Sequence, residues 1–331
     1  MGKKIKNFFK DNWKFLGVLL AIVLIFRIEL PYKIYTPGGM VDLSKRVSVE
    51  SGYHHDGVLG MSYVSVIRGS APFLLLSYLI SDWDIVPESE ITYANESFEE
   101  TFEADKILTK QSIDGAIISA YHEAGKEVSI EKEIVHVTHI DENAQTELKL
   151  FDIILSVEDT PIKNTTELKQ IVSTHHEGDK IKMKILRDNE EREVESTIYN
   201  LNGEPKVGVV LSVTYEYEEN PKAVIEMKDS ESGPSGGLMM ALAIYNSLSE
   251  KDITKGNIVM GTGTIDTLGN VGEIGGVRYK LIGAVKKKAK VFLVPVENYE
   301  EAVAVKNEKN YDIQIIAVKT LKEALEALEK I

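Results

Sequence analysis

Apolar residues follow three different patterns along the 331 residues of this chain. Residues 15–26 form an unbroken apolar run. Residues 131–200 contain short stretches in which apolar and polar positions alternate with the period of two that is typical of strands. Beyond residue 208, apolar strands alternate with stretches of helical period. We therefore expect one apolar helix, a small β-rich module and an α/β domain with its own core.

Turn and cap signals set the limits of the expected elements. Asn164, with Glu167 three residues later, predicts the start of a helix, and Asp188 with Asn189 predicts a turn. The expected strands are 46–49, 61–67, 134–140, 153–157, 180–186, 192–198, 258–260, 291–294 and 313–318. The other expected helices are 97–108, 114–124, 235–248, 277–289 and 321–330.

The apolar run predicts a membrane anchor. Counted over 13–32, a helix of twenty residues is about 30 Å long, the thickness of a bilayer core. Trp13 and Tyr32 would lie at the two interfaces, and the lysines of residues 1–12 favour a cytoplasmic N-terminus with the rest of the chain outside. A cleaved signal peptide is the alternative. We favour an uncleaved signal anchor, because no small-residue cleavage site follows the run.

Charge and composition exclude several classes of function. The formal charge is −14, and because residues 1–30 carry +4, the other 301 residues carry −18. Such an acidic body lacks the basic face of a nucleic-acid-binding protein. The chain has no cysteine, so disulfides, thiolate metal sites and cysteine nucleophiles are excluded. Any nucleophile is therefore an oxygen or an amine.

No cofactor and no metal is expected. His136 and His139 are three residues apart in a predicted strand, which places the two side chains on opposite faces and argues against a shared metal ion. The phosphate-cradling pattern G-x-x-x-x-G-K-[ST] does not occur in the sequence. We therefore expect no nucleotide.

A candidate nucleophile lies in GPSGG at residues 233–237, which fits the G-x-S-x-G pattern of a serine at a tight turn that opens a helix. A serine that only caps a helix gives the same pattern. The α/β-hydrolase triad, and with it an esterase, is excluded because its histidine follows the serine, whereas every histidine here precedes Ser235. The seven histidines are residues 54, 55, 122, 136, 139, 175 and 176.

A lysine can take the place of the histidine, because burial penalises the ammonium form and lowers the lysine pKa. Seven lysines lie between Ser235 and Val291. In a helix starting near Val277, Lys280 lies at the edge of the apolar face, whereas Lys286 points away. Periodicity alone leaves open whether Lys280 is buried or reaches back to water.

Three segments resemble the proteolytic domain of the Lon family, whose members use a Ser/Lys dyad. They are SGPSGG at 232–237, GTGTIDTLGNVGEIGGVRYKLIGA at 261–284 and FLVPVEN at 292–298. The resemblance covers residues 205–331. It implies Ser235 as the nucleophile, Lys280 as the general base and Thr262 as the hydroxyl that orients the lysine amine.

The same resemblance implies how a substrate would lie. The oxyanion would be held by backbone N–H groups around Gly233, Pro234 and Gly236 at the start of the helix, although proline has no N–H to donate. An extended substrate would pair with a strand running from Ala223 to Met227. Lon proteases usually have an acidic residue three positions before the serine. That position here is serine, which leaves the role of any assisting acid open.

The β-rich module at 131–200 resembles a PDZ domain, most clearly in the stretch DIILSVEDTPIKNTTEL. The glycine usual before the aspartate is Phe151, the glycine of the following turn is Asp159, and no glycine-rich carboxylate-binding loop precedes Ile134. Capture of a free C-terminus is therefore left open.

The full order of domains is similar to that of the membrane-anchored Lon-like proteases of Gram-positive bacteria, which include pheromone-processing enzymes. We expect a basic tail at 1–12, an anchor at 13–32, strands and helices at 33–130 that pack with the protease domain, the PDZ-like module and the Lon-type domain. The resemblance implies an ATP-independent serine endopeptidase that cleaves peptides or proteins on the extracytoplasmic face, with homo-oligomerisation left open. The alternative is a membrane-tethered PDZ adaptor that binds peptides and whose protease-like domain is inactive.

Overall fold

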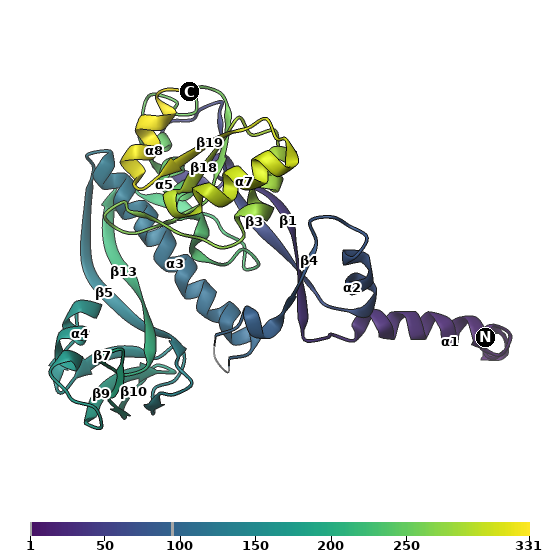
Figure 1. Ribbon diagram of the computed structural model, residues 1–331, viewed down its shortest axis with the longest axis horizontal. Helices are drawn as coiled ribbons and strands as arrows, with labels where there is room; N and C mark the ends of the chain where they lie inside the picture. Colours follow the sequence, from purple (N-terminus) through teal and green to yellow (C-terminus); the bar gives the residue numbers. More distant parts are fainter. Residues whose placement is uncertain (1, 94–95) are drawn as a thin grey trace. The chain divides into compact units, whose positions relative to one another are not determined.

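The computed structural model describes the backbone of residues 2–93 and 96–331 and, within the first helix, the side chains of residue 8 and of residue 10 onward. The chain forms two units. The first comprises Met1–Pro37 and Val64–Ile91, and the second comprises Gly38–Tyr63 and Thr92–Ile331. Strands β1 (Tyr32–Asp42) and β3 (Val58–Arg68) run through both units (Figure 1).

The first unit contains helices α1 (Gly2–Arg27) and α2 (Ala71–Ser77) and strand β4 (Asp84–Pro87), which pairs antiparallel with the first half of β1. Helix α1 covers the start of the predicted helical span over 13–32, but the predicted end at residue 32 is wrong. The helix stops at Arg27 because Pro31 disfavours helical conformation in the residue before it, and Tyr32 already belongs to a strand. Within the described part of the chain, no helix has both the length and the apolar character needed to cross a membrane.

The second unit contains a parallel sheet in which β3, β15, β18 and β19 are successive neighbours. Residues 58–61 of β3 pair with β15, so a segment predicted to lie outside the Lon-type domain supplies one of its strands. Besides β3, its parallel strands are β15 (Ile258–Gly261), β18 (Val291–Pro295) and β19 (Gln314–Val318). Its helices are α3 (Phe98–Glu123), α5 (Gly237–Leu248), α6 (Val277–Lys286), α7 (Tyr299–Lys309) and α8 (Leu321–Leu328).

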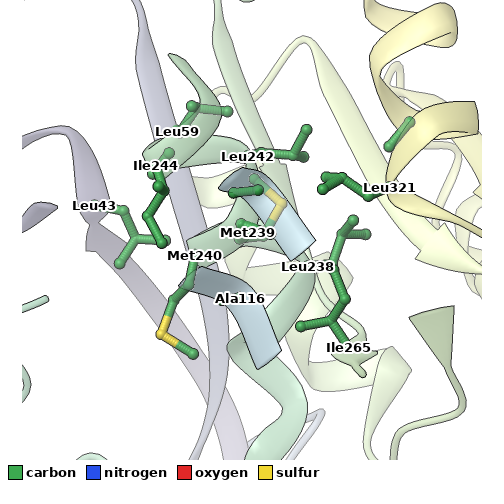
Figure 2. Packing of buried hydrophobic residues seen from close by; sticks show 14 of the residues in the cluster. Leu43, Leu59, Ala116, Leu238, Met239, Met240, Leu242, Ile244, Ile265 and Leu321 are labelled. Carbon is green, nitrogen blue, oxygen red and sulfur yellow. The ribbon is translucent and has the colours of Figure 1, made fainter. Parts of the chain in front are cut away.

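Helix α5 lies at the centre of the largest hydrophobic core. Every residue from Gly237 to Ile244 is buried, as is typical of a helix that is apolar on all sides. Figure 2 shows its side chains packed with Leu59 of β3, Ala116 of α3 and Leu321 of α8. The start of α5 is therefore held rigidly by elements from distant parts of the sequence.

The β-rich module is an antiparallel sheet in the order β13-β5-β7-β9-β10-β6, with its own core. Its helix α4 (Thr165–Ser173) begins as predicted, because the Asn164 side chain accepts the Glu167 N–H at 2.9 Å. Strand β13 extends the sheet beyond the predicted 131–200. The strands are β5 (Glu127–Ile140), β6 (Gln145–Thr146), β7 (Ile153–Val157), β9 (Lys180–Arg187), β10 (Glu190–Thr197) and β13 (Val209–Asn220).

Two positions of this module where the PDZ pattern has glycine keep the backbone that glycine favours. Phe151 has φ 72° and Asp159 has φ 61°, both in the left-handed region. The adjacent Asp152 is buried and forms a two-pronged ion pair with Arg187, in which both N···O distances are 2.7 Å. The module therefore keeps the turn geometry even though the glycines are replaced.

The two predicted helices at 97–108 and 114–124 are one continuous helix, α3. Polar residues between them suggested a break, but Thr109 and Ser112 are buried and hydrogen-bonded. Helix α6 ends at Lys286 rather than at 289, and Lys288 beyond it has φ 59°. Helix α7 was not predicted, because it buries only two apolar side chains, Ala302 and Val305.

The remaining described elements are short. They are β2 (Val47–Val49), β8 (Thr160–Pro161), β11 (Tyr199–Leu201), β12 (Glu204–Lys206), β14 (Ala223–Ile225), β16 (Thr264–Ile265), β17 (Val271–Gly272) and four 3₁₀ turns at Leu43–Lys45, Glu88–Glu90, Pro234–Gly236 and Val296–Asn298.

Candidate active site

Ser235 lies in the 3₁₀ turn Pro234–Gly236, which continues directly into α5. The turn has little room. A Cβ on Gly236 would lie 2.0 Å from Sδ of Met61, and one on Gly237 would lie 2.6 Å from Oγ of Ser112. A larger residue at either position would force these buried neighbours to shift. Ser235 itself is half-buried, and it lies in the turn that opens α5, where the first N–H groups of a helix have no partner within the helix.

Lys280 is almost completely buried, with 4% of its surface exposed. It lies on the face of α6 that also buries Val277, Leu281 and Ala284. Periodicity left open whether Lys280 is buried or reaches water, and the structure shows that it is buried. Burial lowers the pKa of Lys280 to about 8, while the nearby charge of Glu301 acts in the opposite direction. A substantial fraction of this lysine is therefore neutral near physiological pH.

Thr262 connects the lysine to the serine residue. Its hydroxyl accepts a hydrogen bond from Nζ of Lys280 at 3.2 Å and donates one to the Ser235 carbonyl at 3.0 Å. Gly263 donates its N–H to the same carbonyl at 2.8 Å. Since the only hydrogen of the hydroxyl goes to Ser235, Thr262 can only accept from the amine, which directs one lysine N–H toward the threonine. The structure thus brings together the three residues of the predicted catalytic set.

The predicted oxyanion residues differ in what their backbone can offer. The N–H of Gly233 donates to Oγ1 of Thr109 at 2.7 Å and is therefore engaged. The Pro234 carbonyl accepts from Oγ of Ser112 at 2.8 Å and from the Gly237 N–H. These bonds leave the N–H groups of Ser235 and Gly236 as the donors at the helix start.

The predicted substrate strand is shorter than expected. Strand β14 ends at Ile225 and pairs antiparallel with β2, which is its one strand neighbour among the described residues. Ala223 is buried within it, whereas Met227 lies beyond its end and packs against the main core. An extended peptide can add only along the edge of β14 that faces away from β2.

The acidic residue Glu231 of the nucleophile loop is held by partners other than the lysine. Glu231 forms an ion pair with Arg46 and accepts the Lys228 N–H at 3.0 Å. Burial alone would raise the pKa of Glu231, but these partners hold it below its ordinary value. Glu231 therefore fixes the loop to Arg46.

Thr109 and Ser112 of α3 were missed by sequence reasoning, although they hold the two residues that precede Ser235. They come 124 and 122 residues before their partners, so no local pattern connects them. Their spacing of three places both on one face of a helix, which is the only signal the sequence carries.

The two histidines of β5 bind different partners. His136 contacts the Thr214 hydroxyl at 2.8 Å, and His139 contacts Glu96 at 2.9 Å. Burial, and secondarily the charge of Lys110, lowers the pKa of His136. Across residues 2–93 and 96–331, no group of three or more histidine, aspartate or glutamate side chains is arranged to hold a metal ion.

Comparison with known proteins identifies two domains in this chain. Residues 224–330 match the family model of the Lon protease (S16) C-terminal proteolytic domain, and residues 121–198 match that of the PDZ domain. A Lon protease of Helicobacter pylori is 31% identical over 183 residues, which cover 52% of this chain and 21% of that protein. A Lon protease of Campylobacter concisus is 35% identical over 144 residues, covering 43% and 18%. The chain thus spans about a fifth of the length of these relatives.

Solved structures similar to this chain include the PDZ domains of two SdrC-like proteins. The one from Listeria monocytogenes is 17% identical, covers 23% of this chain and 85% of that structure, and superposes with a TM-score of 0.22. The one from Listeria innocua is 21% identical, covers 24% and 92%, and superposes with a TM-score of 0.23. The predicted resemblances are confirmed at the level of the domains. The chain carries a proteolytic domain of the Lon (S16) serine protease family together with a PDZ domain.

Proposed function

We propose that this chain is a serine endopeptidase in which Lys280 is the general base for Ser235. The observation that carries the proposal is the burial of Lys280 with a lowered pKa, joined through Thr262 to the residue that bears the nucleophile. A buried lysine with no catalytic use would be costly, because burial penalises its ordinary charged form. The arrangement favours an active enzyme over an adaptor with an inactive domain.

The proposed reaction has two halves. Neutral Lys280 takes the Ser235 proton as Oγ attacks the scissile carbonyl, and the resulting ammonium then protonates the leaving amine, which gives an acyl-enzyme. Water then attacks the ester while Lys280 again takes a proton. Lys280 returns this proton to Oγ of Ser235 as the ester bond breaks. The N–H groups of Ser235 and Gly236 would stabilise the oxyanion, and a donor of this kind contributes about 3–4 kcal/mol.

We further propose that hydrolysis requires no nucleotide, because each step uses only groups of this chain. The substrates would be peptides or secreted and membrane proteins, such as signalling peptides or pheromones. They would lie along β14, with the PDZ domain selecting among them. The proposed place of action is the extracytoplasmic face of the cell membrane, with the N-terminus in the cytoplasm.

Helix α1 supports the membrane part of the proposal. Its large apolar side chains are exposed at consecutive positions, among them Leu24, Ile25 and Phe26. Because successive residues of a helix point about 100° apart, the apolar surface surrounds the helix instead of forming one stripe. Such a surface favours an apolar surrounding, which a bilayer offers.

The experiment that tests the proposal is hydrolysis of fluorescein-labelled casein by the detergent-solubilised full chain in buffer without nucleotide. We expect steady release of fluorescent fragments by the wild type and none by Ser235→Ala. Cleavage that survives Ser235→Ala would overturn the assignment of the nucleophile. Cleavage only after addition of ATP would overturn the nucleotide-free part.

The hydroxyl of Thr109 provides a further prediction. Thr109→Val keeps the shape of the side chain but leaves the Gly233 N–H without its partner, so the loop that carries Ser235 should shift. We expect kcat to fall about tenfold to a hundredfold, because small misplacements of reacting groups have effects of this size. Thr109→Ser is the matched control and should retain most of the activity. Equal kcat values for the valine and serine variants would contradict a positioning role.

A further inference from the structure

Helix α2 and the turn that follows it expose an unusual number of large apolar side chains. We call this surface, made of Leu75, Leu76, Tyr78, Leu79 and Ile80, the α2 surface. Tyr78 and Leu79 are 80% and 82% exposed. Residues 69–81 contain no charged side chain at all. A contiguous apolar surface of this kind marks a site of contact with a partner or a membrane.

The α2 surface adjoins the apolar part of α1. Phe73 of α2 meets Phe26 of α1 edge to face, with ring centroids 5.9 Å apart. In Figure 1, α2 lies beside the end of α1 that contains Phe26. A surrounding that covers the exposed apolar side chains at that end of α1 is therefore also next to α2.

The polar backbone of the α2 surface is largely satisfied from within. The N–H groups of Leu79 and Ile80 both donate to the Leu76 carbonyl, at 2.9 and 3.0 Å. The Ser77 hydroxyl donates to the Leu74 carbonyl at 2.7 Å. Insertion among lipids requires internal pairing of this kind, because the bilayer offers no partners to a free N–H or O–H.

The borders of the α2 surface are charged. Arg68 precedes it and forms an exposed ion pair with Glu29 at 2.5 Å, and Asp82 follows it. Tyr78, with an apolar ring and a polar hydroxyl, is a residue type enriched at the boundary between lipid and water. An uncharged stretch with charged borders and an exposed tyrosine is typical of an element that enters a bilayer only at its surface.

We infer that the α2 surface inserts into the interfacial layer of a lipid bilayer, as a second and shallow contact beside α1. This inference rests on the membrane placement of α1 in the proposed function. One anchor leaves the first unit free to turn about the helix axis. A second contact through α2 fixes how that unit is oriented on the bilayer.

The test uses the absence of cysteine, which allows a single label at a chosen position. Three variants of the full chain, Leu24→Cys, Leu79→Cys and Leu268→Cys, are labelled with the fluorophore NBD. They are then reconstituted into vesicles of phosphatidylcholine and phosphatidylglycerol. Leu268 is the matched control, because it is as exposed as Leu79, at 82%, and lies in a loop of the second unit. Lipids that carry a nitroxide near the headgroup or deep in the acyl chain quench a label at the same depth.

We expect strong quenching at Leu79 by the shallow nitroxide, quenching at Leu24 by the nitroxide lipids, and none at Leu268. Quenching at Leu24 without quenching at Leu79 would overturn the inference and leave the anchor intact. Absence of quenching at both would overturn the membrane placement of α1 and, with it, the inference. Tyr78→Cys repeats the measurement at a neighbouring position if the label at Leu79 disturbs folding.

Discussion

Replacement of Lys280 by arginine should abolish peptide hydrolysis. Arginine keeps a cation at this position but cannot give up its proton near neutral pH, so it cannot accept the proton of Ser235. We expect kcat/KM to fall by at least about a thousandfold, within the range typical of lost general-base catalysis. The measurement is hydrolysis of a short fluorogenic peptide, beside a thermal unfolding curve of each variant.

A matched variant separates chemistry from folding. Lys280→Met has a similar length and places no charge in the buried site, so it should unfold no earlier than the wild type and still be inactive. Thr262→Val should retain part of the activity, because it removes the partner of the amine but leaves the base. If Lys280→Arg turned over peptide within tenfold of the wild type, the Ser/Lys assignment would be wrong.

The activity of the wild type should rise steeply with pH. The base acts only when neutral, and a pKa of about 8 makes roughly 1% of Lys280 neutral at pH 6 and about 90% at pH 9. We therefore expect kcat/KM to increase about ninetyfold between these values and to level off above pH 9. If the base were a lysine of ordinary pKa, kcat/KM would still rise by up to about tenfold per pH unit at pH 9. If the base were a histidine, kcat/KM would level off near pH 7.5.

Glu301 provides a control for this profile, because its charge raises the pKa of Lys280 against the effect of burial. Glu301→Gln should therefore move the midpoint of the profile to lower pH. Replacement of any one histidine by glutamine should leave the midpoint in place. A midpoint that follows a histidine substitution would refute the lysine as the titrating base.

The resemblance to the Lon family, which is carried by short motifs, located the groups that we propose carry the chemistry. The motif around Ser235 and the helical period around Lys280 depend on neighbours a few residues away, and the structure brings both together through Thr262. Whether Lys280 is buried could not be predicted, since one helix does not show which strands pack over its edge. Burial of this lysine depends on the packing of the whole domain. Periodicity shows only which face of the helix tends to be buried.

The errors in the predicted fold have a common physical origin. Helix α3 was divided in two because its buried polar residues find partners in the Ser235 loop and in strand β13, which no local pattern reveals. The anchor was extended past Arg27 because hydrophobicity does not register the effect of Pro31 on the residues before it. In both places, the interaction that decides whether the helix continues is not visible in the pattern of apolar and polar residues.

The distance along the chain between α3 and the loop that it holds has a consequence for biosynthesis. Ribosomes release the N-terminal part first, so α3 and β3 exist long before the serine that they position. Ser62 of β3 and Gly261 of β15, which form a hydrogen bond, are 199 residues apart, and contacts of such separation form late in folding. The environment of Ser235 is therefore completed only when both halves of the discontinuous domain have been made. A partly synthesised chain therefore lacks the assembled Ser235 site, and the proposed activity can begin only after β15 has joined β3.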